Sequence, residues 1–414
     1  MKKIAFLILY GVALCSFGQS WNPIASPTAL TINSSSFISP DTGWVVTNDF
    51  IFKTTDGGIT WTSQSYPPDP AHDIRMFNSV HFINQHTGII GCGNYLYTGV
   101  DLSQVSCFLW TNDGGANWTY KNLGSSTDYI LDAKLTSPTT AFGTGQYGEA
   151  WATFDAGATW TNMYYTSPYS GCKLFPISRD TAYYAGVENI SNKAAFGRIV
   201  DSSWTASTVI SGGTSYFGAI YFFNRMEGWL GGSSGLLYKT TNGGLSWISF
   251  SSGVTSYITD IIFTDSFNGW FCTNDGKICH TNDSGASWSL EYNGTVPLTD
   301  LSFSGNTGYA VGNTGTILKY SLPDAMIENR NEHSFLLFPN PTQSTISMEI
   351  ELSGQDPLKI EIKNVLGHSV YADQKDLAPG RQKLDLNVAD LPPGIYLLEL
   401  RSRERTLNAT FVKQ

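Results

Sequence analysis

The sequence predicts an all-β protein assembled from a repeated module, and three observations lead to this prediction. No helical periodicity follows the first twenty residues, and Thr, Val, Ile, Tyr, Phe and Trp occur in short runs between Gly and Asn. A unit of roughly 41 to 44 residues recurs along most of the chain, which is the spacing of one four-stranded propeller blade. The C-terminal part instead alternates apolar and polar residues in strands separated by Gly and Pro. The predicted architecture is a seven-bladed β-propeller followed by a small immunoglobulin-like β-sandwich.

The N-terminal residues 1–18 have the pattern of a cleavable signal peptide. Lys2 and Lys3 precede an apolar run that ends at Leu14, and Ser16 and Gly18 form a small-x-small pair before the expected cleavage site. Lipidation of the nearby cysteine is not expected, because Leu14 stands where the lipoprotein peptidase requires a small residue. No other stretch is long enough for a transmembrane helix, so we expect a secreted chain with no transmembrane segment.

The repeat is clearest in two segments, EGWLGGSSGLLYKTTNGGLSW and NGWFCTNDGKICHTNDSGASW, which align without a gap at an offset of 41 residues. Further copies end at Trp61, Trp118 and Trp160, and a degenerate copy ends at Trp204. The last unit, which begins at Thr307, lacks an outer strand, whereas the residues around Trp21 resemble the segment that follows the other tryptophans. A propeller closes when one terminus completes the blade begun by the other, so residues 19–323 are predicted to form seven blades.

Each repeat ends in a turn such as TTDGGITW, which has a structural explanation. The Asp side chain can accept hydrogen bonds from backbone amides ahead of it, the Gly pair supplies positive φ, and the Trp packs into the seam between blades. A residue that performs the same role in every blade is interpreted as structural, not as a catalytic or metal site. These predicted structural residues are Asp56, Trp61, Asp113, Trp118, Asp155, Trp160, Asn242, Trp247, Asp283 and Trp288.

These turns resemble the bacterial neuraminidase repeat, or Asp-box. The longer pattern GW..G..G..YKTT.GG..W resembles the propeller family of photosystem II assembly and stability factors. The resemblance implies the fold. A photosynthetic role is not expected for a chain with an export signal, so only the architecture is transferred.

Five cysteines remain after the signal peptide, in a compartment that permits disulfides. The segment TNDGKI has a two-residue hairpin signal at its centre, which would place Cys272 and Cys279 directly opposite each other, within disulfide reach. Cys92 and Cys107 could close a longer hairpin in the same way, and Cys172 is then left as a buried small hydrophobe. None of the spacings resembles a zinc site, and no metal or cofactor is predicted.

Residues 324–334 read as a linker, and residues 335–414 as the predicted β-sandwich. Three motifs lie in the second segment: Phe338-Pro339-Asn340-Pro341-Thr342, Val365-Leu366-Gly367 and Leu391-Pro392-Pro393-Gly394-Ile395-Tyr396. They resemble the type A sorting domain of the type IX secretion system. The last strand departs from the family at a usual lysine, although Lys413 remains. The resemblance implies the type IX machinery as a partner, passage across the outer membrane, and either release or attachment at the cell surface.

The composition argues against several functions. A net charge of -10 disfavours nucleic acid and anionic membranes as partners. Sialidase chemistry needs three arginines around a carboxylate, and the four in the propeller show no way to converge. His72, His81 and His86 are interpreted as scattered surface residues, because their spacings do not keep one face of a strand. The four arginines are Arg75, Arg179, Arg198 and Arg225.

A binding surface is easier to predict than a catalytic one. The insertions Ser63 to Ser79, Gly93 to Ser106 and Glu188 to Gly197 fall on connections that open on the face opposite the boxes, where they should build one rim. Its mixture of aromatic and hydrogen-bonding groups suits carbohydrate or protein recognition, although these segments could also be merely variable loops. The predicted rim residues are Tyr66, Asp69, His72, Arg75, Tyr95, Tyr97, Asp101 and Asn192.

The sequence therefore predicts a secreted or cell-surface binding protein whose propeller face recognises glycan or protein. The alternative is a secreted glycoside hydrolase of the Asp-box propeller type, which would need a facing pair of carboxylates. A structural surface-layer or adhesion component is a third hypothesis.

Overall fold

The computed structural model describes the chain from residue 20 to residue 413 with interruptions. The described ranges are 20–67, 75–97, 102–126, 129–146, 148–164, 169–188, 193–200, 203–209, 215–321, 337–338, 342–352, 357–364, 368–378, 380–402 and 406–413. The predicted signal peptide and the linker 324–334 lie outside these ranges. The chain divides into two compact units between Pro323 and Asp324, and each is described by itself.

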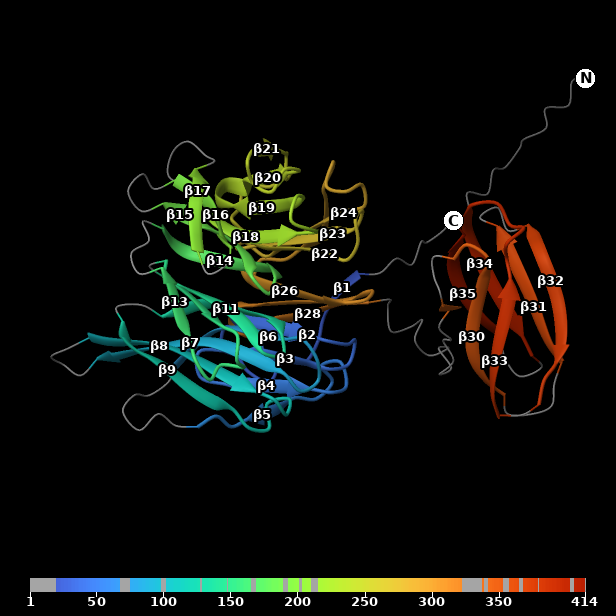
Figure 1. The fold of residues 1–414 in the computed structure, drawn as a ribbon, viewed down its shortest axis with the longest axis horizontal. Coiled ribbons are helices and arrows are strands. Elements are labelled where there is room, and N and C mark those ends of the chain that lie inside the picture. The colour runs from blue at the N-terminus through green and yellow to red at the C-terminus, as the bar shows by residue number, and fades with distance from the viewer. Residues whose placement is uncertain are drawn as a thin grey trace, which may run out of the picture. The chain divides into compact units, whose positions relative to one another are not determined.

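The first unit consists of seven four-stranded antiparallel sheets, the blades of a propeller (Figure 1). Blades 1 to 3 comprise β2 (Ser34–Phe37), β3 (Gly43–Val46), β4 (Ile51–Thr54) and β5 (Thr62–Gln64); β6 (Arg75–Phe82), β7 (Gly88–Tyr97), β8 (Leu102–Thr111) and β9 (Thr119–Ser126); and β10 (Ile130–Ser137), β11 (Thr140–Gly145), β12 (Ala150–Thr153) and β13 (Thr161–Tyr164). Blades 4 to 6 comprise β14 (Tyr169–Ser178), β15 (Thr181–Glu188), β16 (Lys193–Val200) and β17 (Ser203–Val209); β18 (Phe217–Phe222), β19 (Gly228–Gly232), β20 (Leu237–Thr240) and β21 (Ile248–Ser249); and β22 (Ile258–Phe263), β23 (Gly269–Thr273), β24 (Lys277–Thr281) and β25 (Ser289–Asn293).

Blade 7 closes the ring with a strand from each end of the propeller sequence. It comprises β26 (Leu298–Ser304), β27 (Thr307–Gly312), β28 (Ile317–Ser321) and, as outer strand, β1 (Ser20–Pro23). In β1, Ser20 pairs with Ser321 and Trp21 with Tyr320. The predicted fold class and the closure from the region of Trp21 are therefore confirmed.

The two sides of the propeller differ in the turns that they carry. The first-to-second and third-to-fourth strand turns, which include the boxes, lie on one side, called the box side. The second-to-third turns and the connections between blades lie on the opposite side, called the connection side. In blades 5 and 7 the second-to-third turns are single 3-10 turns, η1 (Ser233–Gly235) and η2 (Asn313–Gly315).

The box turns use the same hydrogen bonds from backbone amides in five blades. In blade 6, Asp283 Oδ1 accepts from Ser287 N at 2.9 Å and Asp283 Oδ2 accepts from the Ser287 hydroxyl at 2.6 Å, while Thr281 Oγ1 accepts from Gly285 N at 2.9 Å. The two residues after the acid have positive φ, 63° at Ser284 and 82° at Gly285, which is the region that a Gly pair adopts without strain. The same bonds form around Asp56, Asp113 and Asp155. In blade 5, Asn242 Oδ1 also accepts from Ser246 N, but Asn242 Nδ2 donates to the Ser246 hydroxyl.

The box tryptophans pack against other aromatic side chains, and for three of them, Trp160, Trp247 and Trp288, a contact crosses the seam to the preceding blade. Trp61 lies edge-on to Phe37 at 6.3 Å between ring centroids, and Trp288 lies edge-on to Trp229 at 6.1 Å. Trp160 of blade 3 stacks on Phe108 of blade 2 at 3.9 Å. The remaining two make similar contacts, Trp118 with Phe82 and Trp247 with Phe196 and Phe222.

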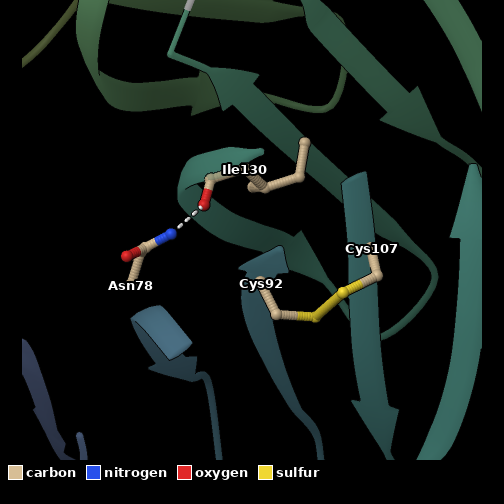
Figure 2. The surroundings of a disulfide bond; sticks show 4 residues. All are labelled: Asn78, Cys92, Cys107 and Ile130. Carbon is tan, nitrogen blue, oxygen red and sulfur yellow. Dashed lines mark hydrogen bonds between the residues drawn. A yellow bond between two sulfur atoms is a disulfide. The ribbon is translucent and has the colours of Figure 1, made fainter. Parts of the chain in front are cut away.

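One of the two predicted disulfides is present. Cys92 and Cys107 face each other in β7 and β8 and are joined by a disulfide midway along the hairpin, as Figure 2 shows. The predicted pairing of Cys272 with Cys279 is wrong, because both thiols are free and buried. The turn between them takes three residues instead of two, so that Cys272 pairs with Ile278 and Phe271 with Cys279. A one-residue shift sends the two side chains to opposite faces of the blade. The side chain of Cys172 lies outside the described residues.

The second unit is a β-sandwich. One sheet holds β29 (Leu337–Phe338), β30 (Thr345–Leu352) and β33 (Gly380–Asn387), and the other holds β32 (Ser369–Asp376), β31 (Pro357–Asn364), β34 (Gly394–Arg401) and β35 (Thr406–Lys413). Their inward side chains, among them Ile346, Ile362 and Leu398, form one buried core. Tyr396 of the last predicted motif stacks on Phe411 at 5.5 Å and donates its hydroxyl to Pro392 O at 2.8 Å, which fixes the Pro-Pro-Gly turn.

Candidate functional site

The innermost strands of the seven blades surround a partly open cavity of about 380 Å³ on the axis of the propeller. Its walls come from β2, β6, β10, β14, β18, β22 and β26. The lining residues lie toward the ends of these strands that lead into the first-to-second turns, so the cavity occupies the box-side half of the channel. It lies within the size range of small-ligand sites, about 300 to 1,000 Å³.

One residue at the same position of each innermost strand lies at the level of the cavity floor, and four of these seven, Asp132, Lys173, Asp260 and Asp300, line the cavity. Most of the seven cap a backbone amide of the next blade. Asp132 accepts from Leu174 N at 2.9 Å, Asp260 from Leu301 N at 3.0 Å. Across the closing seam, Asp300 accepts from Ser35 N at 2.7 Å. Serines do the same in the first two blades, where Ser34 accepts from Val80 N and Ser79 from Ala133 N. We call this set the floor ring; its members in blades 1 to 7 are Ser34, Ser79, Asp132, Lys173, Ala219, Asp260 and Asp300.

A second ring lies two residues further along each strand, nearer the box side. Ser36 accepts from Phe82 N, His81 Nδ1 from Leu135 N, and Ser302 from Phe37 N. The other members of this mouth ring are Lys134, Phe175, Tyr221 and Ile262, so that blades 4 to 6 carry the apolar part. The interpretation of His81 as a surface residue is wrong: it lines the channel, and burial lowers its pKa to about 3, so it is neutral.

Lys173 is the cation of the floor ring. Burial alone would lower the pKa of its ammonium group, but the carboxylates of Asp132, Asp300 and Asp260 outweigh this effect and raise it. Burial, together with the neighbouring Asp300, raises the pKa of Asp260 to about 7. The cavity therefore holds opposite charges in near balance.

The predicted rim residues lie largely outside the part of the chain that the structure describes. This holds for Asp69, His72, Asp101 and Asn192. Arg75 lies at the start of β6, and Tyr95 and Tyr97 lie near the end of β7, but their side chains are not described. Tyr66 packs edge-on against Phe77 at 4.9 Å and donates its hydroxyl to Asp49 O at 3.4 Å.

The hairpin of β7 and β8 is the most prominent feature of the connection side. Each strand has ten residues, against four in β3, and both extend beyond the neighbouring strands in Figure 1. The pairing continues beyond the disulfide, with Tyr95 opposite Gln104 and Tyr97 opposite Leu102. Beside the disulfide, Asn78 Nδ2 donates to Ile130 O at 2.7 Å, which joins blade 2 to blade 3 (Figure 2).

The charged channel residues were not predicted from the sequence. A polar residue recurs at the same position of most first strands, and this pattern could have identified them. The clearest example is the dipeptide Thr-Asp, which ends at Asp260 and again at Asp300, 40 residues later. Among the described residues no group of His, Cys, Asp or Glu is arranged to hold a metal ion, and no helix is long and apolar enough to cross a membrane.

Comparisons with known proteins agree with both units. Residues 336–414 match the secretion system C-terminal sorting domain, and residues 15–120 match the photosynthesis system II assembly factor YCF48. The fold and these matches define a class of protein: a propeller with bacterial neuraminidase repeats joined to a type IX sorting domain, which directs secretion across the outer membrane.

The propeller is similar to YCF48 and HCF136. The photosystem II stability/assembly factor HCF136 of Arabidopsis thaliana is 24% identical over 271 aligned positions; the match covers 50% of this chain and 64%, less than two thirds, of the relative. YCF48 from Cyanidioschyzon merolae is 19% identical with a TM-score of 0.57 over 73% of this chain and 98% of that one. A structure of YCF48 bound to D1 peptide is 20% identical with the same TM-score over 73% and 97%. These structural similarities establish the fold alone.

Proposed function

We propose that this secreted protein is a binding protein whose connection side recognises a protein or glycan partner. Residues 1–18 would act as its signal peptide, and the sorting domain would leave it released or attached at the outer cell surface. The observation that carries this proposal is the hairpin of β7 and β8, a long arm with a disulfide midway along it.

The arm has the properties of a preorganised binding element. The disulfide between Cys92 and Cys107 restricts the hairpin before a partner arrives, which lowers the entropy lost on binding. Two of the predicted rim residues, Tyr95 and Tyr97, belong to the part of β7 beyond it. Aromatic residues supply large contact areas at little conformational cost.

Exposed apolar residues elsewhere on the connection side support the same proposal. Leu30 precedes β2, Phe50 lies in the second-to-third turn of blade 1, and Tyr216 precedes β18; their exposed fractions are 43%, 45% and 44%. The propeller's two chain ends, Ser20 and Ser321, lie on the other side. A solved structure of the similar propeller YCF48 with D1 peptide favours a polypeptide among the candidate partners.

Labelled mature protein applied to a glycan array and to a peptide library would test the proposal. We expect a ligand whose binding falls by at least about tenfold in a Tyr95→Ser, Tyr97→Ser double variant. Phe267→Ser is the matched control, because Phe267 is 59% exposed on the box side. Equal binding by the double variant and the wild type would contradict the proposal.

The glycoside hydrolase alternative lacks comparable support. Each cavity carboxylate of the floor ring has one oxygen engaged by a backbone amide of the next blade, which gives it a structural role. Turnover of a chromogenic glycoside that disappears in Asp260→Asn or Asp300→Asn would favour the hydrolase instead.

A further inference from the structure

The floor ring has a gap between blades 4 and 6. At five of the seven seams, the floor-ring serine or aspartate of one blade accepts a hydrogen bond from a backbone amide of the next blade. That amide belongs to the residue directly after the next blade's own floor-ring residue. Ile220 and Ile261 directly follow the floor-ring residues of blades 5 and 6, so we expect their amides to point toward the preceding blade as in the other seams. Both residues line the cavity. The positions that should cap them hold Lys173 and Ala219, and neither side chain can accept a hydrogen bond.

The gap therefore gathers hydrogen-bond donors in one sector of the cavity. Among the described residues no carboxylate lies within 4.0 Å of the Lys173 ammonium group, and Lys173 lines the cavity together with Ile220 and Ile261. An unpaired buried donor is costly, so these three groups favour an occupant with several acceptors. Next to them, Asp260 and Asp300 use only Oδ2 for their backbone bonds, which leaves Oδ1 of each as an acceptor.

The mouth ring above the gap is apolar. Phe175 and Tyr221 lie edge to face at 5.2 Å between ring centroids, and Ile262 follows them around the wall. The Tyr221 hydroxyl donates to Phe263 O at 2.9 Å, so its ring, not its polar end, is available to an occupant. The sector combines donors and acceptors on its floor with aromatic surface at its mouth.

The charges decide between candidate occupants. Three carboxyl groups and two ammonium groups, those of Lys134 and Lys173, line the cavity. A cation would meet both lysines and an anion would meet the three aspartates, so either would be opposed. A hydroxyl-rich neutral molecule can donate to the carboxylates, accept from Lys173 and the amides, and place its C–H surface on the aromatic rings.

We propose that this cavity binds the terminal unit of a neutral saccharide, in the sector formed by Lys173, Ile220, Ile261, Phe175 and Tyr221. The site lies on the box side and is separate from the proposed partner surface on the connection side. Either can therefore fail without the other.

The repeat itself supplies the sharpest variant. Ala219→Ser would place a hydroxyl where Ser34 and Ser79 have theirs, and that hydroxyl would cap the amide of Ile261 and complete the ring at this seam. A purely structural channel would be unchanged or slightly stabilised by this substitution. A saccharide site would lose one of its donors.

Titration calorimetry on the mature chain would use maltose, cellobiose and lactose as neutral probes, with glucosamine and glucuronic acid as charged ones. We expect at least one neutral disaccharide to bind, and the charged sugars to bind more weakly. Ala219→Ser, with no loss of melting temperature, and Phe175→Leu should each weaken binding by about fivefold to tenfold. Lys173→Met should weaken it further, whereas the exposed Lys359→Met is the matched control.

Three results would overturn the proposal. These are the absence of binding by every neutral probe, preferential binding of a charged one, and full affinity in Ala219→Ser. If Lys173→Met fails to fold, Ala219→Ser and Phe175→Leu still decide the question.

Discussion

At the residue scale, the box acid is a structural group with a pH-dependent contribution to stability. Hydrogen bonds from the Ser287 hydroxyl and the Ser287 amide lower the pKa of Asp283 to about 2. A carboxyl group with a lowered pKa in the folded state stabilises the protein above its unfolded-state value near 4, and this stabilisation is lost as the pH falls toward 2. Blade 5 shows that the charge is dispensable, because Asn242 Oδ1 accepts the same backbone bond, from Ser246 N, while Asn242 Nδ2 donates to the Ser246 hydroxyl.

This comparison predicts different outcomes for two substitutions of one residue. Asp283→Asn should leave the melting temperature near that of the wild type at pH 7, and should lose less stability between pH 4 and pH 2. Asp283→Ala, which removes both acceptors, should lower the melting temperature by a few degrees at pH 7 and by less as the pH falls toward 2. Calorimetric melting across this range measures both, with the exposed Asp41→Ala as control; equal melting curves for the two variants would contradict the structural role.

The buried Asp260 should act in the opposite direction. Burial and Asp300 raise its pKa to about 7, so the folded state binds the proton more tightly than the unfolded state does. Its contribution is complete below about pH 4 and is lost as the pH rises to about 7. Asp260→Asn keeps an acceptor for Leu301 N but has no proton to lose.

We therefore expect Asp260→Asn to melt at a higher temperature than the wild type at pH 8 and at a similar temperature at pH 4.5. Differential scanning calorimetry at the two pH values is the measurement. A variant less stable than the wild type at pH 8 would show that the charged carboxylate stabilises the ring.

At the element scale, the strand β1 decides whether the ring closes. Trp21 is 5% exposed, packs on Tyr320 at 5.1 Å and donates its indole N–H to Glu291 at 3.1 Å, so it joins the closing strand to blades 6 and 7. Trp21→Ala should reduce the free energy of unfolding by about 3 to 5 kcal/mol. Urea unfolding measures the loss, and Ile248→Ala, at a residue 63% exposed in β21, is the control.

Deletion of residues 19–23 is the stronger form of the same test. It would expose the edge of β28, and an unpaired edge strand recruits another chain. Size-exclusion chromatography should then show association. A monomer of unchanged stability would mean that β1 is not needed for closure.

The elements that could be predicted from the sequence are those whose signal repeats. Six tryptophan-terminated units and the homologous segment at Trp21 define the blades, because the same seam is built each time. The pairing of Cys272 with Cys279 failed because a turn of two residues and a turn of three have the same local composition around Asp275 and Gly276. The floor ring was missed for a different reason: its bonds join residues about 40 positions apart, such as Asp260 and Leu301.

At the scale of the whole molecule, the propeller must provide hydrogen-bond acceptors for the channel-facing amides of seven innermost strands. Each innermost strand has an edge that faces the channel, with amides that need acceptors. The floor ring supplies acceptors across five of the seams, including the closing one, where Asp300 reaches Ser35. Closure of the ring therefore also supplies the acceptor for the amide of Ser35. The amides at the two remaining seams stay available to hydrogen-bond a ligand.

The two compact units lead to a final prediction about stability and export. Each unit has its own buried core, so we expect the full chain to unfold in two calorimetric transitions. Removal of residues 324–414 should abolish one transition and leave the other within about a degree. The same truncated chain, expressed in a host with a type IX system, should remain in the periplasm, whereas the full chain crosses the outer membrane. A single cooperative transition would refute the independence of the units, and secretion of the truncated chain would refute the role of the sorting domain.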